Sequence, residues 1–427
     1  MMFTVDPTFR SWIPVSGDGD FSIQNLPYGV MARADGGSAV CTAIGENAVD
    51  LSELHKAGLF RDTAIADQNV FAADHLNVMM ATGRSVWTEI RRRLCELLVE
   101  GGDSGLKENQ SLRDRAIVPL ADVCLKLPVA IGDFTDFYSS KYHATNVGVM
   151  FRGKENALMP NWLHLPVGYH GRASTVFPTG FDVRRPCGQT KADDAASPVY
   201  GPSRLLDFEL EMGFFVGKAN DHGTRVSTAE VVEHIFGLVL VNDWSARDLQ
   251  KWEYQPLGPF LGKSFATTIS PWVVPLDALE PFRTSAQKRE TPILEYLQET
   301  QDSAYDIELE AYVQSADMTE PMRLARTNFK HMYWTIGQQL AHHTVNGTAM
   351  RVGDLCGSGT ISGPTKESRG SMLEICWKGT EPITLPDGTQ RKFFADGDTV
   401  SIRGWCQGDG FRVGFGECSA TILPAVP

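Results

Sequence analysis

The sequence predicts a protein built mainly of β-strands, in which a small N-terminal barrel domain is followed by a larger β-rich domain. Short alternating runs, broken by Gly and Asp, open the chain and are typical of a small barrel. Beyond about residue 129, runs rich in Val, Phe and Ile alternate with Gly and Pro, and helical periodicity is confined to a few segments. The 427 residues include 40 glycines and 23 prolines, above the usual ~12% share, which indicates many tight turns. We therefore expect two domains, residues 1–128 and residues 129–427.

The expected N-terminal domain combines short strands with one clear helix. Phe21–Val30 alternates in the manner of strands separated by turns. Apolar residues then recur at three- and four-residue spacing from Val86 to Leu98, which predicts an amphipathic helix. Arg91–Arg93 lie within it, and we expect them on its solvated face. The glycines that follow predict a loop.

In the larger domain, one apolar run predicts a buried strand, and the residues after it predict a helix. Ile235–Val241 is apolar throughout, as in a strand covered on both faces, and Asp243 stands just beyond its end. Ser245 and Asp248 have the spacing of a capping box, so a helix should begin there and end before Pro256. Two further helices are expected near residues 228–235 and 328–344.

Composition and charge exclude several classes of protein. Lys and Arg number 39 against 52 Asp and Glu, so the formal net charge is −13. Such an acidic chain offers no broad basic surface for nucleic acid and suits an anionic membrane poorly. The N-terminus lacks the apolar run of a signal peptide, and the longest apolar stretch is far shorter than a membrane span. The eight cysteines are scattered without a C-x-x-C pair, which argues against zinc and disulfides and favours reduced thiols in the cytoplasm.

The segment Leu205–Met212 alternates between polar and apolar residues. In a strand, Asp207, Glu209 and Glu211 would share one face, with successive same-face residues about 7 Å apart. Acidic residues are depleted in strands, and the apolar residues at 213–216 predict that one end of this strand is buried. Buried carboxylates need a counter-charge, and hard oxygen ligands suit Ca²⁺ or Mg²⁺. A solvent-facing strand is the alternative.

The helix expected after Asp243 has a polar face, and a purely structural role is the alternative for Arg247 taken alone. Arg247, Gln250 and Tyr254 are spaced to share that face. Lys263 follows in an extended segment rich in Pro and Gly. Asp243 itself lies at a strand end, which is a common position for a ligand.

A third candidate is the loop-like segment 132–146, which contains Asp, Tyr and His residues close together. Its histidine, His143, could serve as a general base, because an imidazole titrates near neutral pH. A purely structural histidine is the alternative.

With these segments in view, the chain resembles the fumarylacetoacetase (fumarylacetoacetate hydrolase) family over nearly its full length. Long blocks in the same order are highly specific, and they match the two-domain enzymes rather than smaller relatives that share only the core. The blocks are Gly132–Ser140, His143–Gly148, Phe151–Leu158, Asn161–Ala173, Asn242–Asp248, Pro256–Phe265, Gly357–Gly363 and Cys406–Gly410.

The resemblance implies a fold and an activity. The fold would be an SH3-like barrel followed by a C-terminal β-roll domain through which the chain forms a homodimer. The activity would be metal-dependent hydrolysis of a C–C bond in 4-fumarylacetoacetate, a small 1,3-diketo acid, to fumarate and acetoacetate. That reaction is the final step of tyrosine and phenylalanine catabolism, which places the protein in the cytoplasm.

The resemblance also implies roles for individual residues. A divalent ion, Ca²⁺, would be held by Asp136, Glu209, Glu211 and Asp243, and Mg²⁺ would lie near Asp243, Lys263 and Thr267. His143 would be the base, oriented by Glu374, while Arg247, Gln250 and Lys263 would stabilise the carbanion or enolate that leaves. Substrate contacts would come from Tyr138, Arg152, Tyr169, Gln250, Tyr254 and Thr360.

Elementary electrostatics agrees with these roles. Four clustered carboxylates carry four negative charges, which one divalent ion halves and which Arg247 and Lys263 bring close to neutrality. Two alternatives stay open: a related acylpyruvate or 1,3-diketone hydrolase or decarboxylase, and a non-catalytic assembly protein that a metal stabilises.

Overall fold

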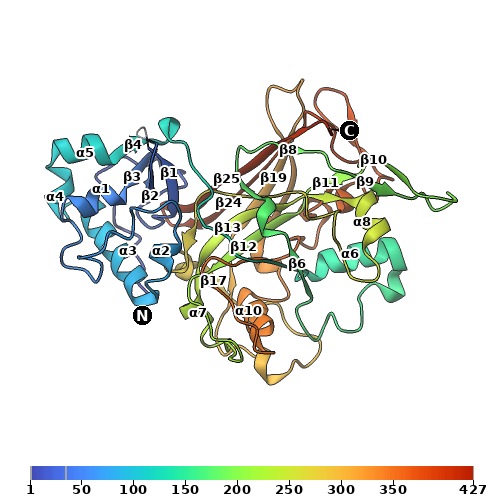
Figure 1. Cartoon of the computed structure of the whole chain (residues 1–427), viewed down its shortest axis with the longest axis horizontal. Helices are drawn as coiled ribbons and strands as arrows, with labels where there is room; N and C mark the ends of the chain where they lie inside the picture. The colour runs from blue at the N-terminus through green and yellow to red at the C-terminus, as the bar shows by residue number, and fades with distance from the viewer. Residues whose placement is uncertain (1, 34–35, 427) are drawn as a thin grey trace.

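The computed structural model describes residues 2–33 and 36–426, and strands dominate it, as expected (Figure 1). A small N-terminal unit lies at one end of a larger body. Its antiparallel sheet has the strand order β1 (Tyr28–Ala32), β2 (Ser38–Ile44), β3 (Asn47–Asp50) and β4 (Ile117–Pro119). The helices around it are α1 (Leu51–Lys56), α2 (Asn77–Met80), α3 (Arg84–Leu98), α4 (Ser104–Lys107) and α5 (Gln110–Ala116).

Helix α3 confirms the periodicity in the sequence and joins the two parts of the molecule. Its Trp87 ring meets the Phe236 ring of the central sheet edge-on, with centroids 5.1 Å apart. The expectation for Arg91 was wrong, because its side chain is buried. Arg91 donates to the backbone carbonyls of Gln24 and Asn25, at 2.5 Å each. Its guanidinium therefore supplies the hydrogen bonds that these two buried carbonyls need in the N-terminal core.

The larger body contains a central eight-stranded sheet. In order across the sheet its strands are β6 (Gly168–Gly171), β5 (Phe134–Phe137), β21 (Leu355–Gly357), β12 (Leu210–Val216), β13 (Ile235–Asp243), β15 (Thr267–Ile269) and β7 (Val176–Pro178), with β16 (Val274–Pro275) also paired to β13. Every residue of β13 is buried, which confirms the strand expected from its apolar run. Asp243 is its last residue, so the strand ends on a buried carboxylate.

A five-stranded sheet packs against the central one. Its order is β20 (Met322–Asn328), β19 (Glu308–Gln314), β24 (Thr399–Gly408), β25 (Phe411–Leu423) and β8 (Val183–Arg184). Leu238 and Leu240 of β13 share one hydrophobic cluster with Ile402 and Val413 of the second sheet. Apolar side chains from both sheets thus form one core between them, as in sheet-on-sheet packing.

Short ribbons and helices complete the body. The two-stranded ribbons pair β9 (Cys187–Thr190) with β10 (Val199–Pro202), β11 (Leu206–Asp207) with β14 (Ser245–Ala246), β17 (Arg283–Thr284) with β18 (Ala304–Tyr305), and β22 (Ile383–Thr384) with β23 (Gln390–Arg391). The α-helices are α6 (Lys141–Arg152), α7 (Val231–His234), α8 (Arg247–Glu253), α9 (Leu276–Leu279), α10 (Ile336–Thr344) and α11 (Met372–Ile375). The 3₁₀ turns are η1 (Leu120–Asp122), η2 (Lys154–Asn156), η3 (Ala173–Thr175), η4 (Glu280–Phe282), η5 (Glu295–Leu297), η6 (Phe329–His331) and η7 (Lys366–Ser368).

Three segments differ from the expected secondary structure. The helices predicted near 228–235 and 328–344 are shorter, since α7 spans four residues and a 3₁₀ turn precedes α10. The alternating segment 205–212 is not one strand, because β11 and β12 are interrupted at Phe208 and Glu209. Residues 206–212 are buried on both faces, so the carboxylates of Asp207, Glu209 and Glu211 do not face solvent.

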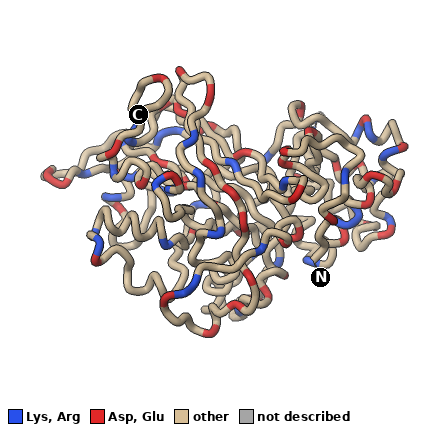
Figure 2. Tube along the Cα trace, turned by 180° about the vertical axis from the view of Figure 1, so that it is seen from behind, with Lys and Arg blue, Asp and Glu red and all other residues tan. Residues whose placement is uncertain are grey.

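The distribution of charged residues and the state of the cysteines match what the composition led us to expect. Figure 2 shows acidic and basic positions interspersed along the described chain. All eight cysteines are free thiols, six of them buried. Within residues 2–33 and 36–426, no helix combines the length and apolar character needed to cross a membrane.

Candidate active site

Four acidic side chains meet within the central sheet: Asp136 comes from β5, Glu211 from β12, Asp243 from β13, and Glu209 from the link before β12. Asp136, Glu209, Glu211 and Asp243 are all buried, and each offers an oxygen within 4.8 Å of the others. Asp136 approaches Glu211 across β21, where Gly357 pairs with Asp136 on one side and with Gly213 of β12 on the other. A Cβ atom at Gly357 would stand 2.7 Å from Asp136 Oδ1, so the absence of a side chain there makes room for the cluster.

Two buried cations neutralise part of this charge. Lys263 Nζ pairs with Glu209 and lies 2.5 Å from Asp243 Oδ2, and Arg247 Nη2 lies 2.8 Å from Glu209 Oε1. Burial alone would raise the pKa of Glu209, but Lys263 and Arg247 outweigh it and hold that pKa below its ordinary value. Burial would likewise lower the pKa of Lys263, but Asp243 and Glu209 raise it, so the ammonium stays charged.

The remaining two carboxylates are not neutralised by the protein. Burial, reinforced by Asp243, raises the pKa of Asp136, and burial with Asp136 and Asp243 nearby raises the pKa of Glu211. Asp136 Oδ1 and Glu211 Oε1 are buried without any hydrogen-bond partner. Unpartnered carboxylate oxygens that converge from several sides suit a hard divalent cation, so these residues fit a metal ion.

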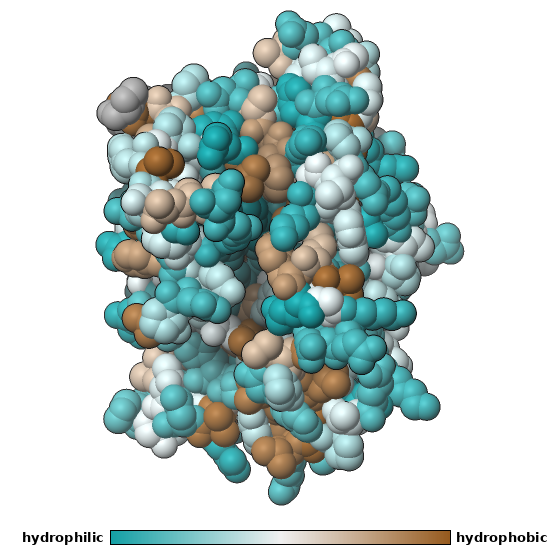
Figure 3. Space-filling model, turned by 90° about the vertical axis from the view of Figure 1, so that its right-hand side faces the viewer, coloured by the Kyte–Doolittle hydropathy of each residue, from teal (hydrophilic) through white to brown (hydrophobic). Residues whose placement is uncertain are grey.

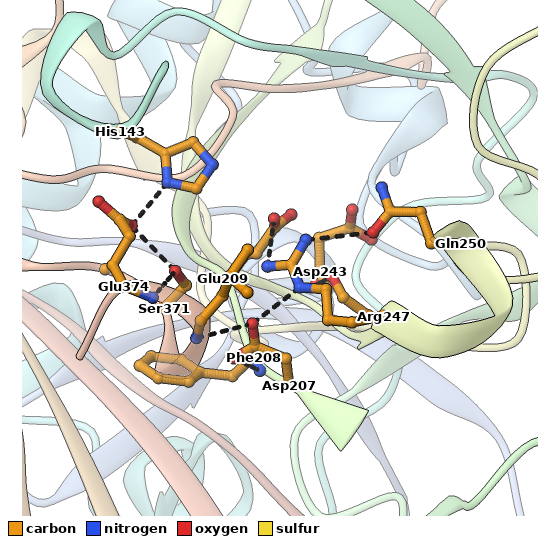
Figure 4. A network of polar contacts seen from close by, with 12 residues as sticks. His143, Asp207, Phe208, Glu209, Asp243, Arg247, Gln250, Ser371 and Glu374 are labelled. Carbon is orange, nitrogen blue, oxygen red and sulfur yellow. Dashed lines mark hydrogen bonds and ion pairs between the residues drawn. The ribbon is translucent and has the colours of Figure 1, made fainter. Parts of the chain in front are cut away.

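A histidine and a glutamate form a second buried pair beside the cluster (Figure 4). His143 Nδ1 lies 2.6 Å from Glu374 Oε2, and both residues are buried. The segment expected to be loop-like is in fact β5 followed by α6, and His143 lies in the first turn of that helix. Ser140 caps the helix by accepting from the His143 amide. The bond at Nδ1 leaves Nε2 as the nitrogen that can take a proton.

Glu374 is held by several donors besides His143. Asn146 donates to its Oε1 at 2.8 Å, Ser371 donates to its Oε2 at 2.9 Å, and Ser362 reaches both oxygens. Burial alone would raise the pKa of Glu374, but His143 and these hydrogen bonds hold it below its ordinary value. The carboxylate is therefore ionised and fixed in one orientation.

The sequence analysis did not predict the three residues that donate hydrogen bonds to Glu374 besides His143, namely Asn146, Ser362 and Ser371. Asn146 had a usable signal, since it follows His143 by three positions and therefore shares its helix face. Ser362 and Ser371 had none, because only the fold brings their loops to α6.

Helix α8 carries the guanidinium, but it does not begin as predicted. The expected capping box is wrong: Ser245 belongs to β14, and the helix starts at Arg247 after Ala246, which provides no side-chain cap. Asp248 instead accepts from Ser203 Oγ at 2.6 Å, so a contact distant in the sequence replaces the local cap.

The polar face of α8 is partly confirmed. Arg247 Nη1 donates to Gln250 Oε1 at 3.2 Å, so these two side chains lie together beside the carboxylates. Tyr254 lies beyond the helix end and is exposed, with its hydroxyl accepting from Gln255. Thr267 Oγ1 donates to Asp243 Oδ1 at 2.9 Å from the adjacent strand.

The remaining expected substrate contacts divide into two groups. The Tyr138 ring packs edge-on against His143 with centroids 5.2 Å apart, and the Tyr169 hydroxyl donates to Asp243 Oδ2 at 3.0 Å. Thr360 Oγ1 is buried without a partner, which leaves it available to a ligand. Arg152 is exposed at the end of α6, where two of its nitrogens bond the carbonyls of Asn156 and Ala157.

Figure 3 shows the face that bears α6, α8 and the β9–β10 ribbon. A furrow with apolar residues along its margins crosses this face (Figure 3). Exposed apolar side chains on the segment after α8 include Leu257, Phe260 and Leu261.

Comparisons with known proteins agree with this geometry. Residues 24–128 match the family model described as fumarylacetoacetase N-terminal, and residues 134–423 match the model described as fumarylacetoacetate hydrolase C-terminal. The chain is 53% identical to the fumarylacetoacetase of Bos taurus over 418 residues, which is 97% of this chain and 99% of that protein. The fumarylacetoacetase of Homo sapiens gives the same identity and coverage. A solved fumarylacetoacetate hydrolase from psychrophilic Exiguobacterium antarcticum, 15% identical, shares the fold with a TM-score of 0.52 over 93% of this chain and 99% of that one.

Proposed function

The chain belongs to the fumarylacetoacetase family, and from this membership we propose that it hydrolyses fumarylacetoacetate at a carbon–carbon bond, releasing fumarate and acetoacetate. One observation carries the proposal. A buried carboxylate cluster with unpartnered oxygens lies beside two cations and a histidine–glutamate pair. Hydrolysis of a C–C bond needs these three elements, since it requires an activated water and a stabilised carbanion.

His143 and Glu374 activate the water. Nδ1–H of His143 donates to Glu374, which fixes the tautomer and stabilises the imidazolium that forms. Nε2 removes a proton from water, and the hydroxide adds to a carbonyl carbon of the substrate. The C–C bond then breaks, its electron pair passes to the acetoacetate fragment as an enolate, and that fragment takes up a proton.

Arg247, Gln250 and Lys263 stabilise the enolate. The largely buried guanidinium is held by Glu209, and the buried ammonium by Glu209 and Asp243, so both are oriented before the substrate binds. In a site that excludes water their charge acts more strongly than at a surface.

Asp136, Glu209, Glu211 and Asp243 would hold a divalent ion, which we assign to Ca²⁺. Such an ion would polarise a substrate carbonyl and neutralise developing negative charge. We assign Asp243, Lys263 and Thr267 to Mg²⁺. Lys263 could serve there only through its backbone carbonyl, because an ammonium offers no lone pair. The fit is less complete at this second site, because Asp243 already accepts from Thr267, Tyr169 and Lys263.

The substrate is positioned from several elements of the catalytic body. Thr360 offers its unpartnered hydroxyl, and Tyr138 lies against the base. Tyr169 and Gln250 lie beside the carboxylates and Arg247, respectively. Arg152 and Tyr254 are exposed, and Arg152 suits the substrate carboxylate.

The same membership supports a domain division and a cellular context. We assign residues 1–128 to an SH3-like barrel domain and residues 129–427 to a β-roll domain, in keeping with the separate N-terminal sheet. Exposed apolar residues such as Leu257 and Tyr200 support a homodimer, and the eight free thiols support a reducing cytoplasm. The reaction is the last step of tyrosine and phenylalanine breakdown.

Product analysis tests the activity. The purified protein is incubated with 4-fumarylacetoacetate and Ca²⁺ or Mg²⁺, and fumarate and acetoacetate are quantified against an acylpyruvate and other 1,3-diketo acids. Fumarate release with preference for fumarylacetoacetate supports the proposal. Preference for an acylpyruvate would contradict it, and release of CO₂ would identify a decarboxylase.

A further inference from the structure

Asp207 is a buried carboxylate that none of the roles above uses. It lies in β11, two residues before Glu209, and has no exposed surface. It is not part of the metal cluster. Its carboxylate accepts hydrogen bonds from two directions (Figure 4).

One direction leads to the group that stabilises the enolate. Asp207 Oδ2 accepts from Arg247 Nε at 2.8 Å. The other guanidinium nitrogens reach Glu209 at 2.8 Å and Gln250 at 3.2 Å, so Asp207 is the third point that fixes the plane of the guanidinium.

The other direction leads to the water-activating pair. Asp207 Oδ1 accepts from the Met372 amide at 2.7 Å, and Oδ2 accepts from the Leu373 amide at 3.1 Å. These two amides open α11, the helix that carries Glu374. Ser371, which caps that helix and donates to Glu374, also forms a β-bridge with Glu209.

We propose that Asp207 is a positioning residue for the hydrolysis: its carboxylate holds Arg247 on one side and the first turn of α11 on the other, and so fixes the enolate-stabilising cation relative to the His143–Glu374 pair. This inference rests on the proposed function. It adds to that function one side chain that contacts both Arg247 and the helix that carries Glu374.

The physical reason is that these groups are buried together and share one acceptor. The two oxygens of the Asp207 carboxylate have enough lone pairs to accept from Arg247 and from two backbone amides at once. A displacement of about 1 Å between catalytic groups can lower a rate about 100-fold. Loss of Asp207 should therefore affect turnover more than substrate binding.

Asp207→Asn is the decisive variant. The amide keeps the size of the side chain, but its NH₂ group would face Arg247 Nε–H or the α11 amides, and a donor would then meet a donor. We expect kcat to fall about 10- to 100-fold while KM stays within about threefold. A wild-type kcat in folded Asp207→Asn protein would overturn the inference.

Asp398→Asn is the matched control. Asp398 is also buried and accepts from an arginine, Arg391, at 2.8 and 2.9 Å and from a backbone amide, that of Ala395, at 2.8 Å. Neither partner belongs to the site. We expect this control to lower the melting temperature as Asp207→Asn does while kcat stays within about twofold. A comparable loss of kcat in the control would reduce Asp207 to a structural residue.

Arg247→Lys provides a second route, including the case in which Asp207→Asn fails to fold. Lysine keeps the charge but lacks the Nε–H that meets Asp207. We expect kcat to fall at least about 10-fold, and a fall of less than threefold would overturn the inference. In the Arg247→Lys background, Asp207→Asn should cost much less than in the wild type, because the shared contact is already lost. Strict additivity would contradict that coupling.

Amide hydrogen exchange separates this inference from the proposed function. Residues 371–375 should exchange faster in Asp207→Asn than in the wild type and in Asp398→Asn, with or without turnover of any substrate. A wild type that releases no fumarate contradicts the proposed function alone. Unchanged exchange in α11 contradicts the positioning role alone.

Discussion

His143 Nδ1 on α6 lies 2.6 Å from Glu374 Oε2 on α11, across 231 positions of the sequence. Both side chains are almost completely buried, and four further contacts orient the carboxylate. Such insulation lets a neutral imidazole act as a base whose conjugate acid is stabilised in place. The predictions below test this pair and the elements around it.

His143→Ala should abolish turnover but leave the fold and metal binding intact. Without the base, we expect kcat to fall by about 10²–10⁴. The measurement is fumarate release together with a Ca²⁺ titration followed by melting temperature. His222→Ala, at an exposed histidine, is the control and should match the wild type. Turnover at the wild-type rate in His143→Ala would contradict the assigned role.

Glu374→Gln should lower stability near neutral pH, and the effect should fade in acid. Burial would raise the pKa of Glu374, but His143 and the hydrogen bonds hold it below its ordinary 4.5. A carboxyl with a lowered folded-state pKa contributes stability above its unfolded pKa, and loses it as the pH falls through the folded value. We expect the variant to lose about 1–3 kcal/mol of unfolding free energy at pH 7, with the difference shrinking below about pH 4.5.

Urea unfolding of both proteins at several pH values measures this difference, and comparison with the wild type cancels the other acidic groups. A difference that stayed constant into acid would show that the charge of Glu374 does not matter for stability.

Divalent ions should stabilise the protein, and chelation should destabilise it. Burial, reinforced by the neighbouring carboxylates, of which Asp243 acts on both, raises the pKa values of Asp136 and Glu211, and an ion would relieve the repulsion among these groups. At 100 times its dissociation constant, an ion that binds only the folded state adds about 2.7 kcal/mol. The melting temperature should rise with Ca²⁺ and fall with EDTA.

Glu211→Gln should weaken this response, whereas Glu310→Gln should keep it. Glu310 is also buried but is bonded to Arg323 and Tyr312 on the second sheet. An equal response to Ca²⁺ in both variants would place the ion elsewhere.

Asp277→Ala should be strongly destabilising, because it leaves a buried cation unpaired. Asp277 pairs with Arg84 of α3, and their side chains are only 2% and 8% exposed. Breaking a buried pair in this way costs about 3–5 kcal/mol. The control is Glu417→Ala, whose partner Arg403 lies on the surface, and it should cost at most about 1 kcal/mol. Similar urea midpoints for the two variants would contradict the prediction.

Gly262→Ala should impair turnover by displacing α8. A Cβ atom at Gly262 would lie 2.7 Å from the backbone of Gln250, so the helix would have to shift. Overpacking of this kind costs about 1–3 kcal/mol, and a displaced Gln250 and Arg247 should lower kcat about 10-fold. Gly201→Ala has open space around its Cβ and should behave as the wild type. An unaffected kcat in Gly262→Ala would show that α8 adapts freely.

The sequence by itself determined those features that depend on neighbours along the chain. The apolar run Ile235–Val241 predicted a buried strand, and the spacing of Val86–Leu98 predicted a helix, and the structure confirms both. The alternation around Glu209 and Glu211 placed two carboxylates close together before any fold was known. The long blocks shared with one family identified the chemistry.

Only the tertiary structure decided which distant groups meet. Asp136 reaches the cluster because β21 pairs with both β5 and β12, and that register is set by burial rather than by any local signal. Asp248 accepts from Ser203 Oγ instead of capping α8. The Arg91 side chain is buried and donates to the backbone carbonyl of Gln24. Such contacts form because a buried polar group must find a partner wherever the fold supplies one. For the same reason Asp207, which the sequence only placed on a face of a strand, lies where it can join Arg247 to the helix of Glu374.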